Sequence, residues 1–243
     1  MIRIAAAYKD LLNLYGDYAN LTVLVRYLRE SGFLVETDEL SVGSYINLKS
    51  VDLLYLGAGT ERRMLLALND FKRFFRELRD FTEKGGFILA TGSAAALLGN
   101  TVVDYNGDIH TGAGLLDMDI TLIKRRVYSD LILSTPFSED PAVGVINSSM
   151  VVISREKPMF NIDKDSSRKN RKTEGAYKNT VFATELSGPL LVRNPSLLHF
   201  FAEQVSDKKI PVSQELWVDN SREGYRRVLE NLRHEMKGSL WQR

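Results

Sequence analysis

The stretch Phe87-Ile88-Leu89-Ala90-Thr91-Gly92-Ser93-Ala94-Ala95-Ala96-Leu97-Leu98-Gly99 joins a short apolar run to a row of small residues. Residues 87–90 have the length and composition of a buried strand. The alanines that follow are small enough to let the next element pack closely on the strand. The sequence therefore predicts a buried strand followed by a closely packed element, and the surrounding chain repeats this strand-and-helix alternation.

Upstream of this stretch, short apolar runs alternate with amphipathic ones. Asn20 is a candidate cap for a helix that ends near Gly32. Leucines and phenylalanines at helical spacing over residues 61–83 predict one long helix that buries an aromatic stripe. The predicted strands are residues 2–8, 33–38 and 51–56. Alternating strands and helices predict an α/β fold with a mixed, mostly parallel sheet flanked by helices.

Downstream, the pattern changes to short β-like runs without long helices between them. Such runs predict antiparallel strands appended to the parallel sheet. Residues 154–178 are polar and are interpreted as a solvated loop, although the basic residues within it could also contact phosphate. The runs are 119–124, 129–133 and 150–153; a further strand is expected at 180–184 and helices at 195–205 and 212–237. No linker divides the chain, so residues 1–243 are expected to form one domain.

The composition excludes several kinds of protein. The 243 residues include no cysteine, which rules out disulfides and thiolate metal sites, and three scattered histidines make a zinc site improbable. Asp104, Asp108 and Asp117 do not have metal-ligand spacing. A net charge of +1 gives no field that would favour nucleic acid or a membrane surface. No signal peptide or membrane-spanning stretch is visible, so a cytoplasmic protein without metal or cofactor is expected.

Five separated segments resemble the class I glutamine amidotransferases of the CobB/CobQ type, whose domain is flavodoxin-like, and among them most closely the GatD subunits of lipid II isoglutaminyl synthases. Together the segments keep the family's order and approximate spacing over nearly the whole chain, which is stronger than any one of them alone. They are Leu12-Asn13-Leu14-Tyr15-Gly16-Asp17-Tyr18-Ala19-Asn20, Gly57-Ala58-Gly59-Thr60-Glu61-Arg62, Ala90 to Gly99, Gly114-Leu115-Leu116-Asp117, and Thr173 to Asn179 leading into Glu185-Leu186-Ser187-Gly188-Pro189-Leu190-Leu191.

The resemblance implies a reaction for which this chain lacks the reactive groups. In the family, a cysteine on a strand-to-helix elbow attacks the glutamine amide, and a histidine transfers the proton. Here the nucleophile position is Gly92 and the histidine position is Ser187. Loss of such a pair lowers the rate of the reaction at least about 10⁴-fold. No catalytic residue is therefore expected in this chain.

The remaining candidates are binding residues of the emptied site. The turn Gly57-Ala58-Gly59 is expected to offer free N–H groups, as the family's oxyanion hole does, to an anion or a carboxylate. Ser93 is either a shifted nucleophile, which would need His110 or His199 beside it, or the N-cap of a helix. Arg126 is either a substrate-gating arginine, as the resemblance implies, or a surface strand residue. Asp17 and Asn20 are interpreted as turn and cap residues rather than ligands.

The resemblance suggests a GatD-like protein without glutaminase activity. Such a protein would act as a binding, structural or regulatory subunit, beside a MurT-like Mur ligase that amidates a peptidoglycan precursor. Two other interpretations stay open: an enzyme that uses Ser93 in a new reaction, and a small-molecule-binding domain built from the same emptied site.

Overall fold

The computed structural model describes residues 1–167 and 171–238, and its centre is a six-stranded sheet, here called sheet A. Its strands are β11 (Ala176–Lys178), β12 (Val181–Thr184), β4 (Phe87–Thr91), β3 (Leu53–Leu56), β1 (Ile2–Ala7) and β2 (Val35–Leu40), in that spatial order. All neighbours are parallel except β11 and β12. The expected α/β class with a mostly parallel sheet is confirmed.

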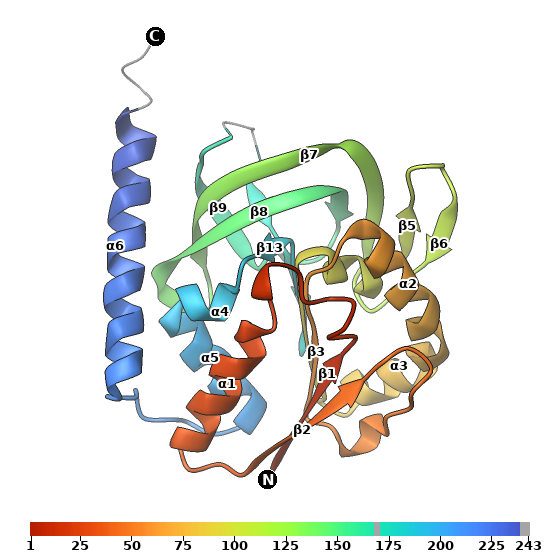
Figure 1. Cartoon of the computed structure of the whole chain (residues 1–243), viewed down its shortest axis with the longest axis horizontal. Coiled ribbons are helices and arrows are strands. Elements are labelled where there is room, and N and C mark those ends of the chain that lie inside the picture. Colours follow the sequence, from red (N-terminus) through yellow and green to blue (C-terminus); the bar gives the residue numbers. More distant parts are fainter. Residues whose placement is uncertain (168–170, 239–243) are drawn as a thin grey trace.

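Helices cover both faces of sheet A (Figure 1). On one side lie α1 (Ala19–Glu30), α4 (Leu190–Arg193) and α5 (Pro195–Ser206), and on the other lie α2 (Glu61–Phe71) and α3 (Phe75–Glu83). The short 3-10 turns η1 (Leu14–Gly16) and η2 (Leu48–Ser50) lie in loops. The last helix, α6 (Leu216–Gly238), stands along one side of the molecule. Its apolar residues Tyr225, Leu229 and Leu232 pack with Ile132 and Val143.

The prediction of one helix over residues 61–83 is wrong, because the 3-10 turn η3 (Lys72–Phe74) separates α2 from α3. Both Phe71 and Phe74 are buried. A 3-10 turn brings side chains three residues apart into line, so this tightening directs both rings into the core. The ring of Phe71 also lies edge-on to Tyr8, whose hydroxyl donates to Asp70 at 2.8 Å.

The antiparallel strands form a separate sheet, sheet B, so the expectation that they extend the parallel sheet is wrong. The expected short runs belong to two long strands, β7 (Met118–Thr135) and β8 (Ser138–Ser154), which arch over the carboxyl ends of sheet A (Figure 1). Alternation along the sequence predicts strands but does not say which strands become neighbours. Sheet B also contains β5 (Thr101–Val103), β6 (Ile109–Thr111), β9 (Phe160–Asp165), β10 (Thr173–Glu174) and β13 (Leu186–Ser187).

Residues 154–178 are not a solvated loop throughout, because β9, β10 and β11 lie within them. Phe160 is buried and Ile162 packs against the core, which the surrounding charged residues conceal in the sequence. Lys164 lies in β9, whereas Arg168 and Lys169 of the basic run fall outside the described residues. In the described part of the chain, no helix has the length and apolar character needed to cross a membrane.

Candidate functional site

The bend after β4 keeps the geometry of an elbow. Gly92 has a φ of +58°, which places it in the left-handed region, and the 3-10 turn η4 (Gly92–Leu98) begins there. Left-handed backbone is strained for residues with a Cβ but not for glycine. The turn is stabilised by burial, since Ala94, Ala96 and Leu97 have no exposed surface.

The two family positions for nucleophile and base still face each other. A Cβ placed on Gly92 would lie 3.8 Å from the Cβ of Ser187, which comes from β13. The same Cβ would lie only 2.5 Å from the Cβ of Ala58. The space that a side chain at position 92 would need is therefore already occupied by Ala58.

Ser93 is bound to the glycine turn rather than free to react. Its hydroxyl accepts from the Gly59 N–H at 2.9 Å and donates to the Gly59 carbonyl at 2.8 Å. The expectation of a free N–H at Gly59 is wrong for this reason, and the Ala58 N–H is likewise bound, to Asp17 at 2.9 Å. The N-cap interpretation of Ser93 is also wrong, because Thr91 holds the cap position of η4.

Two of the histidines are engaged far from the elbow. His110 lies 3.0 Å from an Asp104 oxygen, and His199, half-buried on α5, lies 2.8 Å from the Tyr27 hydroxyl. His234 lies on α6. Within residues 1–167 and 171–238, the hydrogen bonds of the Ser93 hydroxyl go only to Gly59. A serine nucleophile needs a base at hydrogen-bonding distance, so this arrangement does not favour a serine hydrolase.

A buried carboxylate, Asp17, ties the elbow to the glycine turn. Its Oδ2 accepts from the Ala58 N–H and the Tyr55 hydroxyl, both at 2.9 Å, and from the Thr91 hydroxyl. Its Oδ1 accepts from the Asn20 amide at 3.3 Å. Burial raises the pKa of Asp17, while the hydrogen bonds from Thr91, Tyr55 and Ala58 act in the opposite direction.

Asn20 completes this buried cluster and is not a helix cap. Helix α1 begins at Ala19, after Tyr18 at the cap position. The Asn20 carbonyl oxygen accepts from the Leu191 N–H at 2.7 Å, and its amide also donates to the Tyr55 hydroxyl at 2.9 Å. The interpretation of Asn20 as a cap residue is therefore wrong, whereas Asp17 does lie in the turn after η1. The sequence did mark both residues as candidates, since they lie in the first segment that resembles the family. It did not reveal their hydrogen-bond partners, because these lie far away along the chain.

Replacement of Asp17 by asparagine is expected to lower the free energy of unfolding by about 2 kcal/mol. The new side-chain NH₂ group would face a donor in either orientation, the Ala58 N–H or the Asn20 amide. Asn20 cannot rotate to accept it without losing the Leu191 bond. Urea unfolding measures the change, with Asp38→Asn on the exposed edge of β2 as the control. Equal losses in the two variants would contradict the role of the cluster.

Arg126 lies in an exposed bulge of β7 and joins three elements at the rim of the site. Its guanidinium donates to Glu61 at 2.5 Å and to the Asn147 carbonyl at 2.9 Å. Ser149 donates to the same Glu61 oxygen at 2.5 Å. Burial opposes ionisation of Glu61, but the hydrogen bonds from Ser149 and Arg126 outweigh it and lower its pKa. Arg126 is thus a strand residue with a defined ion-pair partner two residues beyond Gly59.

A second buried acid, Glu174, binds the segment that leads into Ser187. Glu174 accepts from the Thr184 hydroxyl and from the Glu185 N–H, both at 2.7 Å. Arg171 donates to Glu185 at 2.6 Å. Burial, followed by the negative charge of Glu185, raises the pKa of Glu174 to about 7. Glu174 is therefore a group that can change its protonation state near neutral pH, and it is hydrogen-bonded to residues that come just before Ser187.

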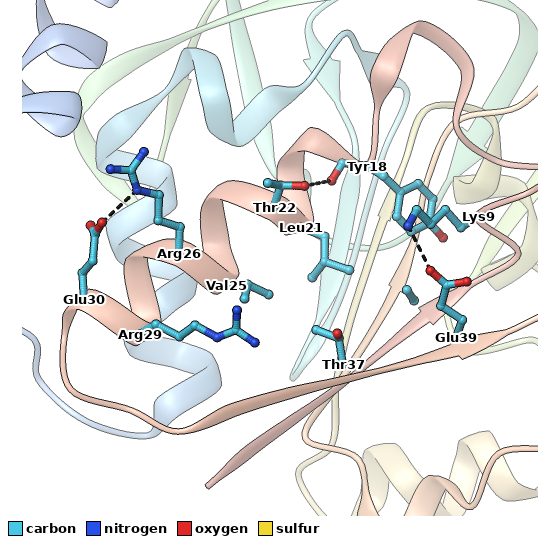
Figure 2. A pocket seen from close by; sticks show the side chains of 11 residues that line it. Lys9, Tyr18, Leu21, Thr22, Val25, Arg26, Arg29, Glu30, Thr37 and Glu39 are labelled. Atoms are coloured by element: carbon cyan, nitrogen blue, oxygen red, sulfur yellow. Dashed lines mark hydrogen bonds and ion pairs between the residues drawn. The ribbon is translucent and has the colours of Figure 1, made fainter.

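A groove of about 530 Å³ lies away from the elbow, between α1 and β2 (Figure 2). Its cations are already neutralised or bonded: Lys9 pairs with Glu39 at 2.9 Å, Arg26 pairs with Glu30 at 2.8 Å, and Arg29 donates to the Val35 carbonyl. In residues 1–167 and 171–238, no group of three histidine or acidic side chains is placed to hold a metal ion.

Comparison with known proteins identifies a family with this architecture. Residues 3–195 match the model of the CobB/CobQ-like glutamine amidotransferase domain. The chain belongs to this family. It is 22% identical over 212 residues to subunit GatD of the glutamine-hydrolysing lipid II isoglutaminyl synthase of Streptococcus pneumoniae. That alignment covers 86% of this chain and 82% of the relative. It is also 22% identical over 215 residues to the Staphylococcus aureus GatD subunit, covering 88% of each chain.

Solved structures agree with the family at the level of the fold. A glutamine amidotransferase crystal structure aligns with a TM-score of 0.55 and 15% identity, covering 84% of this chain and 98% of the other. A glutamine amidotransferase from Thermotoga maritima aligns with a TM-score of 0.53 and 13% identity, covering 100% and 99% of the two chains. At these identities the likeness concerns the fold, so the properties of this CobB/CobQ-like domain have to be argued from its own residues.

Proposed function

We propose that this chain is a GatD-like subunit without glutaminase activity, which takes part in lipid II amidation in the cytoplasm as a binding, structural or regulatory subunit beside a Mur-ligase-type partner. The observation that carries the proposal is the elbow itself. Gly92 faces Ser187 where the family reaction needs a thiolate and an imidazole, and Ala58 fills the space between the turn and the elbow.

The hydrogen bonds around the elbow support the same interpretation. Stabilisation of a tetrahedral intermediate requires backbone N–H groups that point at its oxyanion. Here the Gly59 N–H is bound by Ser93 and the Ala58 N–H by Asp17. The arrangement of Ala58, Gly92, Ser93 and Ser187 together supports the proposal that this site lacks glutaminase activity. Residues 1–243 are proposed to form one domain, because sheets A and B share one apolar core.

A subunit role is supported by the relatives, since both GatD proteins are named as subunits of a synthase. The match covers most of this chain and most of each relative, and the family segment reaches from residue 3 to residue 195. The scaffold has therefore been kept while the reactive groups differ, as expected of a chain that is retained for binding rather than for catalysis.

Purified protein is expected to release no glutamate from glutamine above a heat-treated control. Without nucleophile and base, the rate should fall at least about 10⁴-fold below that of a working glutaminase. The assay uses Staphylococcus aureus GatD, assembled with its own partner, as the positive control. Turnover by the present chain that scales with its concentration and survives repeated purification would contradict the proposal.

A further inference from the structure

The carboxylate of Glu61 is held by donors from three elements. Arg126 of β7 and Ser149 of β8 both donate to its Oε1, each at 2.5 Å. Its own backbone N–H, in the first turn of α2, donates to the carboxylate as well. The positive end of a helix dipole favours an anion at this place. These donors together form a binding site for a carboxylate, and Glu61 occupies it.

The two side-chain donors are held in place by partners other than Glu61. Ser149 is 2% exposed, and its single proton goes to Glu61, so the Tyr105 hydroxyl at 2.8 Å must donate to the Ser149 oxygen. Arg126 also donates to the Asn147 carbonyl at 2.9 Å. Both donors therefore keep their positions if the carboxylate is taken away, and the buried Ser149 hydroxyl would then lack an acceptor.

The charges around the contact favour an anion. Residues 61–63 and 124–126, which this contact joins, carry five cationic side chains and one carboxylate, that of Glu61. The Glu61 side chain is 14% exposed, whereas that of Arg126 is 43% exposed, so the guanidinium can be reached from solvent. A local excess of positive charge attracts small anions. A free carboxylate would therefore be drawn to the same donors if Glu61 did not fill them.

We propose that Glu61 is a built-in occupant of a carboxylate-binding site formed by Arg126, Ser149 and the first turn of α2, and that it excludes small carboxylates, amino acids among them, from this rim. A group on the same chain has an effective concentration that free ligands at millimolar levels do not exceed. Glu61 lies two residues beyond Gly59, which binds Ser93, so the exclusion acts beside the elbow. It holds whether or not the elbow can react, and is thus independent of the proposed function.

The test removes the occupant and supplies a free carboxylate in its place. Glu61→Ala leaves Arg126 and Ser149 present, and potassium acetate is the probe, with potassium chloride at equal ionic strength as the reference. With a Kd of about 10 mM for a ligand of this size, about 100 mM acetate should raise the folding equilibrium constant of Glu61→Ala about tenfold, and that of the wild type less than about twofold. Urea unfolding measures both values. If Glu61→Ala is largely unfolded, acetate should restore its folding in the same measurement.

Two further variants decide whether the acetate effect belongs to this site. Glu61→Ala/Arg126→Ala should lose most of the response, because the charged donor is gone. The matched control is Glu77→Ala, which removes an acidic residue from the first turn of α3 and should respond like the wild type. No acetate response in Glu61→Ala, or an equal response in the double variant, would reduce the contact to an ordinary ion pair and overturn the inference. An equal response in the wild type would show that Glu61 excludes nothing. In each case the glutaminase assay, and with it the proposed function, is unaffected.

Discussion

Gly92→Ala is expected to lower the free energy of unfolding by roughly 2 to 5 kcal/mol. Two effects add. A residue with a Cβ costs about 1 to 2 kcal/mol in the left-handed region, where Gly92 has a φ of +58°. The new Cβ would also lie 2.5 Å from the Cβ of Ala58, and overpacking of this kind costs about 1 to 3 kcal/mol.

The two contributions can be separated with variants that the chain itself offers. Gly16 has a φ of +69° and no atom within 4 Å of an added Cβ, so Gly16→Ala reports the conformational cost alone. The double variant Ala58→Gly/Gly92→Ala removes the contact and is expected to recover about 1 to 3 kcal/mol of coupling energy in a double-mutant cycle. Urea unfolding of the four variants measures both quantities. Strict additivity of the Ala58 and Gly92 changes would show that Ala58 does not fill the site.

The free energy of unfolding is expected to fall by roughly 3 kcal/mol between pH 4.5 and pH 7 through Glu174 alone. The folded pKa of Glu174 is raised from 4.5 to about 7. In this window the native state keeps a proton that the unfolded state releases, so stability decreases as the pH rises and is constant above about 7. Glu174→Gln has no proton to lose and should abolish this slope, becoming more stable than the wild type at pH 8.

The control for this pH dependence is Glu83→Gln at the exposed end of α3. Its pH profile should run parallel to that of the wild type, because an exposed carboxyl contributes little to linkage. Unfolding in urea at pH 5 and pH 8 suffices to compare the three proteins. Parallel profiles for Glu174→Gln and the wild type would place the titration on another group.

The sequence predicts the parallel part of the fold well, because buried strands and amphipathic helices leave regular apolar patterns. It does not predict the break at Lys72–Phe74, since the aromatic spacing across Phe71 and Phe74 suits both an α-helix and a tightened turn. Sheet B is missed for a different reason. The pairing of β7 with β8 and β5 depends on contacts between segments whose local patterns look alike.

At the site, the positions of Gly92 and Ser187 follow from the motifs, and the structure places them face to face. The bonds that close the site do not follow. Ser93 binds Gly59 and Asp17 binds Ala58 across separations of 34 and 41 residues, which no local pattern records. Buried polar groups form hydrogen bonds with whatever partner the fold supplies. The sequence around a serine or aspartate in a turn-like segment therefore predicts a turn and does not reveal the distant hydrogen-bond partner.

The strand order of sheet A has a consequence for synthesis of the chain. Strand β4 pairs with β12, with Thr91 opposite Thr184, and all of β5 to β9 is made in between. At ribosomal rates of about 5 to 20 residues per second, the edge of β4 stays without its neighbour for roughly 5 to 20 seconds. The unpaired edge of a strand whose residues are all buried in the folded protein invites intermolecular pairing. The nascent polypeptide is therefore most vulnerable to aggregation during this interval, and chaperone capture should peak there.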